Sequence, residues 1–450
     1  SARSESGVAD PAVDDGVVRH VVPGLAPGRT YEYEIVQAGA RVGAGLCDTL
    51  PVAGTPFAIA YLSCLFHNQD TAEWVADALA AHPVPVKLVV FQGDTPYIDV
   101  PTTEQAMWGE TSRGLLHWIR ARIDSEAGGV VANYDYTDPT ERALIKAQAY
   151  NVHRAFRRTP GVKRIIERYA TIWQADDHER PGDNVTRDDY AQMNSTGSPP
   201  VVIVANNDQN NEVFDICREA FQAYYIGNPS NGDANNDSNY DDDDQTYFRL
   251  RCNDDLEMLF VDTTEYKTKA ADAADVRKIV GDTQRAWLTA QVAASTATSK
   301  LISSPAALSG VWRTAAEETA AHPQTADGSD AGERDVIMQA LEGFNVLAWI
   351  AGDLHHTHVS MHNGIPCIEC CPVRATFSQA AGGWDADGRL YLRGGTGNVG
   401  SDRNGIFGIV DIHPDGMQHW QVERWGMFKR RAGRQYAGSN ALVYEPVKVA

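Results

Sequence analysis

The sequence has no long hydrophobic run. No stretch of about 18 apolar residues occurs anywhere in it, which excludes a transmembrane helix. Basic residues are also scarce, because 39 Lys and Arg stand against 60 Asp and Glu and leave a net charge of −21. A surface of that sign repels nucleic acid and anionic membranes, so we expect no nucleic-acid binding. It also repels anionic substrates, and a site that handles phosphate then needs local cations to reverse the field.

Cysteine is sparse and odd in number. The seven cysteines leave at least one thiol unpaired, and their spacing reveals no pairing. The chain opens on Ser1-Ala2-Arg3 without the basic and apolar regions of a signal peptide, so any export signal was removed or was never there. The 43% of hydrophobic residues that are present suffice for a large folded core with a small accessory domain.

The first 54 residues have the pattern of antiparallel strands. Bulky residues alternate with polar ones at Tyr31, Tyr33 and Ile35, after two Pro-Gly turn dipeptides. We expect a short β segment with one buried face. A complete β-sandwich of the immunoglobulin type takes about 100 residues. This segment therefore either packs on the main domain or lacks its first strands.

From Phe57 onward the pattern changes to that of an α/β protein. Short apolar runs predict buried strands, and segments with apolar residues every three or four positions predict helices. The expected strands cover residues 57–62, 86–91, 171–175, 256–261, 300–304 and 346–350, followed by 407–412 and 417–422 in a strand-rich C-terminal part. The expected helices cover about 72–81, 104–125 and 140–158. This order predicts an α/β sandwich with its site along one sheet edge.

Four groups of potential metal ligands follow the expected strands. Thiolate, carboxylate, phenolate and imidazole groups bind transition metals, and carboxylates suit calcium or magnesium. Each group alone also has an ordinary structural explanation, because a buried Cys is a small apolar residue and Asp favours turns and N-caps. Four such groups at strand ends in one chain favour a shared metal site. The groups are Cys64; Asp94 with Tyr97; Asp176, Asp177 and His178; and Asp353 with His355.

The order of these motifs resembles that of the PhoD-like alkaline phosphatase family, within the calcineurin-like metallophosphoesterases. The motifs that carry the resemblance are Ser63-Cys64, Gly93 to Tyr97, Asp176 to Glu179, Val261 to Thr264, Gln284 to Leu288 and Gly352 to His355. The resemblance implies an α/β fold, a four-layer αββα metallophosphoesterase sandwich. It also implies two parts, a partial fibronectin III-like β segment over residues 1–54 and a catalytic domain over residues 55–450.

The resemblance also implies roles for single residues. Cys64, Asp94 and Tyr97 would surround a ferric ion, and Asp94 would also face an adjacent calcium ion. Asp177 takes the position of a ligand at that second site, and His178 takes that of the proton-donating histidine. Asp353 and His355 are further candidate ligands of the ferric ion, and Asn184 and Glu369 are additional candidates on the calcium side. The expected cofactors are therefore Fe(3+) and Ca(2+), with another divalent metal as the alternative.

Three features depart from the family pattern or stand apart from it. Thr264 occupies a position where the family usually has Arg, which bears on substrate preference. The acidic insert 231–244 is either a solvated loop or a separate calcium-binding loop, and it has neither a Gly at the central position of an EF-hand loop nor the terminal Glu. The segment 367–371 contains three cysteines but no second ligand pair at zinc-finger spacing, which favours a core strand over a zinc site.

The resemblance implies a metal-dependent phosphoric ester hydrolase, an alkaline phosphatase or phosphodiesterase that acts by attack of a metal-held hydroxide on phosphorus. Its expected partners are small-molecule phosphate esters, and its expected location is secreted, periplasmic or extracellular. One alternative is a catalytically silent, metal-stabilised surface or adhesion protein. Another is a phospholipase D-like diesterase of lipids or teichoic acid. The sequence leaves the oligomeric state and the choice between monoesters and diesters open.

Overall fold

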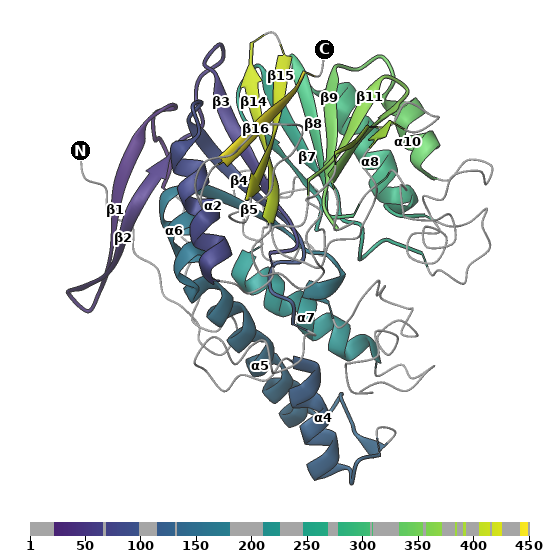
Figure 1. Cartoon of the computed structure of the whole chain (residues 1–450). Coiled ribbons are helices and arrows are strands. Elements are labelled where there is room, and N and C mark those ends of the chain that lie inside the picture. Colours follow the sequence, from purple (N-terminus) through teal and green to yellow (C-terminus); the bar gives the residue numbers. More distant parts are fainter. Residues whose placement is uncertain are drawn as a thin grey trace.

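The computed structural model contains two β-sheets and helices that pack on them (Figure 1). The residues that the structure describes are 22–65, 69–98, 115–130, 133–180, 210–225, 246–268, 278–306, 308, 333–353, 357–370, 383–384, 390–392, 405–414, 416–424 and 442–448.

The first sheet has six strands in the order β16-β15-β14-β3-β4-β5. The three strands that begin the α/β region are parallel neighbours, and the C-terminal strands add to them antiparallel through β14. The strands are β3 (Phe57–Leu62), β4 (Val86–Gln92), β5 (Ala170–Gln174), β14 (Gly405–His413), β15 (Gly416–Arg424) and β16 (Leu442–Lys448). The expected strands of this sheet are thereby confirmed.

The second sheet has eight strands in the order β12-β13-β10-β11-β9-β8-β7-β6. Its centre, from β7 to β9 and on to β11, is parallel. The strands are β6 (Phe248–Arg251), β7 (Leu256–Phe260), β8 (Ser299–Ser304), β9 (Val346–Ala351), β10 (Thr357–His362), β11 (Ile365–Cys370), β12 (Gly383–Trp384) and β13 (Leu390–Leu392). This confirms the three expected strands of the middle of the chain.

The period of two along β3 separates two hydrophobic cores. Ile59 and Tyr61 point into a cluster that also contains Met258 and Ile350 of the second sheet, so this cluster joins the facing sheets. Ala58, Ala60 and Leu62 belong to another cluster, on the opposite face. Because both faces are covered, the strand is an uninterrupted apolar run rather than an alternating one.

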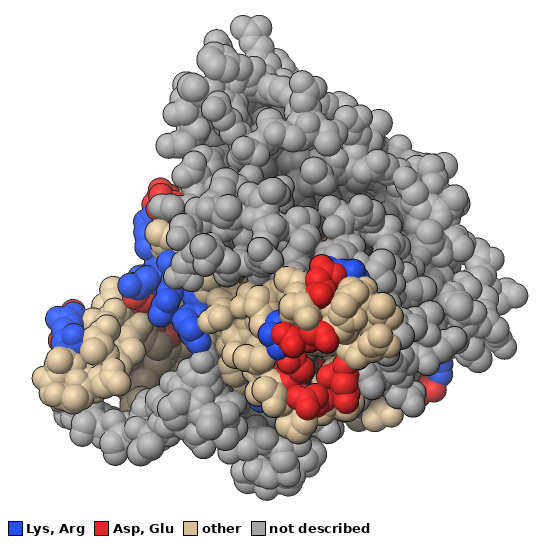
Figure 2. All heavy atoms as spheres, turned by 90° about the horizontal axis from the view of Figure 1, so that it is seen from below, with Lys and Arg blue, Asp and Glu red and all other residues tan. Residues whose placement is uncertain are grey.

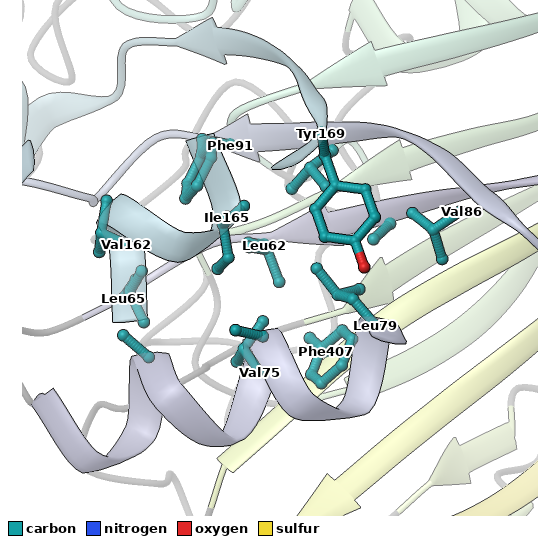
Figure 3. Close-up of a cluster of buried hydrophobic side chains, with 14 of the residues drawn as sticks. Leu62, Leu65, Val75, Leu79, Val86, Phe91, Val162, Ile165, Tyr169 and Phe407 are labelled. Atoms are coloured by element: carbon teal, nitrogen blue, oxygen red, sulfur yellow. The ribbon is translucent and has the colours of Figure 1, made fainter. Parts of the chain in front are cut away.

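Helices cover the outer face of each sheet. Val75 and Leu79 of α2 and Ile165 of α6 pack against Leu62 and Phe91 of the first sheet (Figure 3). The helices α8 and α10 contribute apolar residues to a cluster on the outer face of the second sheet. The helices are α2 (Gln69–Ala81), α4 (Leu115–Glu126), α5 (Pro139–Arg158), α6 (Pro160–Arg168), α7 (Asn210–Tyr225), α8 (Gly281–Ala294) and α10 (Glu333–Leu341), with a 3₁₀ turn η3 (Asp177–Glu179).

The helices α4, α5 and α7 form an arm below the sheets (Figure 1). Asp138 caps α5 by accepting the backbone N–H groups of Thr140 and Glu141, and Pro139 begins the helix. The expected helix 104–125 corresponds in its described part to α4, while residues 101–114 lie outside the described residues. No helix of the described part is long and apolar enough to cross a membrane.

The arm carries acidic side chains at its lower end. Figure 2 shows Asp and Glu gathered on that end with a few Lys or Arg atoms beside them, and a larger group of Lys and Arg toward the N-terminal hairpin. On α4 the carboxylates of Asp124 and Glu126 are more than half exposed and pair with Arg120 and Arg122 one turn away. Such exposed pairs contribute little to stability, about 0.3–0.5 kcal/mol each.

The N-terminal segment is described from residue 22 and forms the hairpin β1 (Thr30–Gln37) and β2 (Ala40–Asp48). It packs on the C-terminal end of α6, where a Cβ on Gly45 would lie 2.5 Å from the carbonyl oxygen of Glu167. The buried Asp48 carboxylate accepts hydrogen bonds from Lys87 Nζ at 2.8 Å and from Arg168 at 3.0 Å. The expected antiparallel pairing is confirmed, and the division at residue 54 stays a prediction.

Candidate metal centre

The potential ligands lie where strands end. Cys64 follows β3, Asp94 follows β4 and Asp176 follows β5, three neighbouring parallel strands of the first sheet. Asp353 follows β9 in the middle of the second sheet. Because parallel strands end at the same edge, the two sheets bring these side chains together, as the sequence predicts.

Three of these residues have backbone conformations that favour glycine. The φ angles are +53° at Cys64, +55° at Asp94 and +73° at Asp353. A non-glycine residue with positive φ is uncommon and costs on the order of 1 kcal/mol or more, and such residues gather at functional sites. The chain therefore turns sharply after each strand and carries the side chain into the site.

Direct contacts join the first two motifs. The Asp94 carboxylate accepts hydrogen bonds from Tyr97 OH at 3.2 Å and from Cys64 Sγ at 3.5 Å. Cys64 Sγ also lies 3.8 Å from the carbonyl oxygen of Asp353, and Ser63 Oγ accepts the backbone N–H of Asp353 at 3.2 Å. Cys64, Asp94 and Tyr97 are almost completely buried. These three side chains thus lie together in one buried cluster.

The Asp-Asp-His-Glu motif forms a 3₁₀ turn that faces the Asp94 loop. Asp176 caps the turn, and the Glu179 side chain reaches back to the Asp176 N–H at 2.8 Å. Glu179 also accepts the N–H groups of Asp94 at 2.9 Å and of Thr95 at 2.5 Å. The imidazole of His178 lies beside the Tyr97 ring, with 4.2 Å between ring centroids.

Two overlapping sets of side chains have ligand atoms close enough to hold a cation. Asp94, Asp177 and His178 form one set, and Asp176, Asp177 and Asp353 form the other, with the atoms of each set within 4.8 Å of one another. Asp177 belongs to both. Asp94 Oδ1 and Asp176 Oδ2 are buried and have no hydrogen-bond partner within the described structure, a costly condition that a bound cation removes. The donor set therefore fits metal ions.

The electrostatics of this cluster also favour cations. Burial, followed by repulsion from neighbours that include Asp177 and Cys64, raises the pKa of Asp94 well above its usual range, against attraction from His178. Burial and the charges of Asp177 and Asp353 likewise raise the pKa of Asp176. Without positive charge the raised pKa values favour the protonated carboxyl groups, whereas a bound cation favours the ionised carboxylates.

The sequence model of the PhoD-like phosphatases matches residues 59–367. This chain belongs to the PhoD-like phosphatase family. The match spans the Cys64, Asp94, Asp176–Glu179 and Asp353 motifs and confirms the resemblance inferred from them. No curated protein sequence matches the chain.

Two solved structures are similar to this chain. The structure of PhoD is 15% identical to this chain, with a TM-score of 0.59, over 94% of this chain and 78% of PhoD. The purple acid phosphatase PPD1 from seeds of yellow lupin (Lupinus luteus) is 9% identical, with a TM-score of 0.49, over 89% of this chain and 58% of the plant enzyme. The likeness to PhoD shows a shared fold, and membership of a phosphatase family supports phosphoester hydrolysis as the reaction class.

Not every residue expected at this PhoD-like site is described. His355, Asn184 and the acidic insert 231–244 lie outside the described residues. Glu369 lies on β11, and the structure does not describe its side chain. Thr264 is buried, and its N–H and hydroxyl both donate to Asp262 Oδ1, at 2.7 and 3.0 Å, so it closes the loop after β7.

The sequence groups Asp176 with the potential metal ligands, but the family resemblance assigns it to neither ion. The structure places it in a cluster with Asp177 and Asp353. Its position directly after Ala175, at the carboxyl end of β5, is the signal that indicates this role. The sequence likewise indicates Glu179 only as part of this motif, whereas the structure shows its carboxylate accepting the backbone N–H groups of Asp94, Thr95 and Asp176.

Proposed function

We propose that this protein is a metal-dependent phosphoric ester hydrolase with Fe(3+) and Ca(2+), or another divalent metal, as cofactors. The observation that carries the proposal is the pair of ligand sets that share Asp177, at the edge where both sheets end. The family adds the reaction class.

The donor types suggest how two ions would be divided. A ferric ion suits Cys64, Tyr97 and the Asp94 carboxylate between them, and a hard divalent ion suits carboxylates such as Asp176 and Asp353. Asp177, which belongs to both ligand sets, would lie between the two ions. We also propose His355, Asn184 and Glu369 as further ligands. Bound cations would neutralise charge on the phosphoryl oxygens and lower the pKa of a coordinated water.

The carboxylates and His178 would contribute to the reaction in different ways. The carboxylates would bind cations, whose positive charge attracts a phosphate ester to a molecule whose net charge of −21 otherwise repels it. His178 is partly exposed, and its ring packs beside that of Tyr97 at a tilt of 38°, which places the imidazole next to the ligands. We assign it the donation of a proton from an imidazole nitrogen to the departing alkoxide oxygen.

The finer features follow from the same family. We propose that the two facing sheets with outer helices form the four-layer αββα sandwich of metallophosphoesterases, and that the β1–β2 hairpin belongs to a fibronectin III-like segment. We further propose a secreted, periplasmic or extracellular location and small phosphate esters as substrates. Activity on diesters as well as monoesters is compatible with the same chemistry.

An activity panel tests the proposal. A chromogenic phosphate monoester and a diester are each incubated with the protein as purified, after chelation, and after return of iron or calcium separately. We expect turnover that disappears on chelation and returns with metal. Asp94→Asn should abolish it, whereas Asp124→Asn on the exposed face of α4 should not. Wild-type turnover by metal-free Asp94→Asn contradicts the proposal, and a stable, metal-loaded protein that is inert on both esters favours the silent surface protein.

A further inference from the structure

Two buried glutamines cross from the first sheet to the second. Gln92, the last residue of β4, donates from Nε2 to the carbonyl oxygen of Ile350 at 2.9 Å and to Ser303 Oγ at 3.0 Å. Gln174, the last residue of β5, donates from Nε2 to the carbonyl oxygen of Val261 at 2.9 Å. Each amide therefore fixes a strand of one sheet against the backbone of the other.

Ser303 of β8 connects the two glutamines. Its hydroxyl accepts from Gln92 Nε2 and donates to Gln174 Oε1 at 2.5 Å, which gives a continuous chain Gln92–Ser303–Gln174. All three side chains are almost fully buried. We call these three residues the inter-sheet chain.

The inter-sheet chain occupies positions where apolar residues are expected. Leu88 and Val90 precede Gln92 on the inward face of β4 and belong to the apolar core between the sheets. Gln92 Oε1 has no hydrogen-bond partner within the described structure, so the polar group at this position carries a desolvation cost. A well-packed apolar residue at this position would stabilise the fold at least as well. We therefore infer that the amides fix the position of one sheet relative to the other.

The inter-sheet chain lies directly before the ligands. Gln92 is two residues before Asp94, and Gln174 is two residues before Asp176. Ile350, whose carbonyl oxygen Gln92 holds, is three residues before Asp353. The set Asp176, Asp177 and Asp353 takes two members from the first sheet and one from the second, so its spacing depends on how the sheets are held here.

We propose that Gln92, Ser303 and Gln174 are positioning residues that set the distance between Asp353 and the Asp176–Asp177 pair. They thereby set the affinity of the cation that spans the two sheets. This inference rests on the proposed function only in taking these carboxylates as cation ligands. Residues that orient ligands typically change metal affinity 10- to 100-fold when replaced.

The test measures metal binding without activity. Chelated Gln92→Met and Ser303→Ala proteins are titrated with Ca²⁺ by calorimetry at a temperature where unfolding curves show both to be folded. Ser303→Ala removes a single hydroxyl and provides the milder variant if Gln92→Met does not fold. Leu88→Ala is the matched control, because it lies on the same face of β4 and in the core between the sheets. Its cavity lowers stability without touching the inter-sheet chain.

We expect both variants to bind Ca²⁺ at least about 10-fold more weakly than wild type, and Leu88→Ala to bind like wild type. The variant that combines Gln92→Met and Ser303→Ala should weaken binding by less than the product of the two single effects, because both substitutions interrupt the same inter-sheet chain of hydrogen bonds. Wild-type affinity in both variants overturns the proposal, and so does equal weakening in Leu88→Ala. If wild type binds Ca²⁺ but hydrolyses no phosphate ester, the proposed function fails while this test remains decisive.

Discussion

The Glu179 carboxylate accepts the backbone N–H of Asp94 at 2.9 Å and so connects the turn after β5 to the loop after β4. The same carboxylate binds the N–H groups of Thr95 and Asp176. Burial raises the pKa of Glu179 to about 7, against the lowering effect of these N–H groups. One buried side chain therefore holds two ligand-bearing loops in register.

Glu179→Gln should destabilise the protein and weaken metal binding together. The amide keeps one oxygen, and its NH₂ group faces N–H donors that then lose their acceptor. Each buried donor left unpaired costs about 1–3 kcal/mol. Urea unfolding of chelated protein measures the first effect and metal titration the second. Glu126→Gln on exposed α4 is the control and should change neither, and a Glu179→Gln protein equal to it in both would refute this role.

Gly93→Ala should be far more damaging than Gly343→Ala. Both glycines have nearly the same φ, +84° and +83°, so the intrinsic strain of adding a side chain is the same. A Cβ on Gly93 would lie 2.4 Å from Asp176 Cβ, whereas a Cβ on Gly343 meets nothing within 4 Å. Unfolding free energies of the two variants, compared with wild type, separate contact from strain. Equal losses would show that this close approach of the two loops is unimportant.

The sequence predicts the strands well because most are buried on both faces. The run Phe57–Leu62 is apolar throughout, and Val86–Gln92 is apolar except for Lys87 and Gln92, so local pattern suffices to find both strands. It also predicts Asp94 and Asp353 at strand ends. It does not predict that β14 pairs with β3, because that contact joins residues far apart in the chain.

The inter-sheet chain could not be predicted for a related reason. The spacing of Leu88, Val90 and Gln92 shows that they share a face, but nothing in the sequence tells which strands of the other sheet that face meets. The same holds for Asp176, whose role depends on Asp353 approaching from the second sheet. The local sequence pattern predicts which residues share a face of a strand and where the strand ends. It does not predict which residues of the other sheet that face contacts.

His153 should make the protein sensitive to acid. Burial, with the positive charges of Arg180 and Arg157, lowers the pKa of His153 to about 3, against about 6.5 in an unfolded chain. The unfolded state binds the proton first, so stability is complete above about pH 6.5 and is lost as the pH falls toward 3. The loss is on the order of 1 kcal/mol per pH unit in that window. In urea unfolding from pH 7 to 4, His153→Gln should lose less stability than wild type, and parallel curves would contradict this.

Metal removal should matter more as the pH rises. Burial raises the pKa values of Asp94 and Asp176 in the metal-free protein, so the folded state holds protons that the unfolded state has released above about pH 4. The unfolding free energy of chelated protein therefore falls as the pH rises toward the raised pKa values of these carboxyl groups. In metal-loaded protein, the positive charge of the cations stabilises the ionised carboxylates and opposes this loss. The Tm difference between loaded and chelated protein, scanned from pH 5 to 8, should grow, and a constant difference would count against this origin.

The central claim is that two cations share Asp177, and metal content per chain tests it most directly. Wild type, Asp177→Ala and Asp353→Ala are reconstituted with iron and calcium, desalted and assayed by elemental analysis. The shared position predicts about two ions in wild type, loss of both in Asp177→Ala and loss of one in Asp353→Ala. Asp124→Ala, on the exposed arm, should match wild type. An Asp177→Ala protein that is folded and keeps the full metal content would contradict the account.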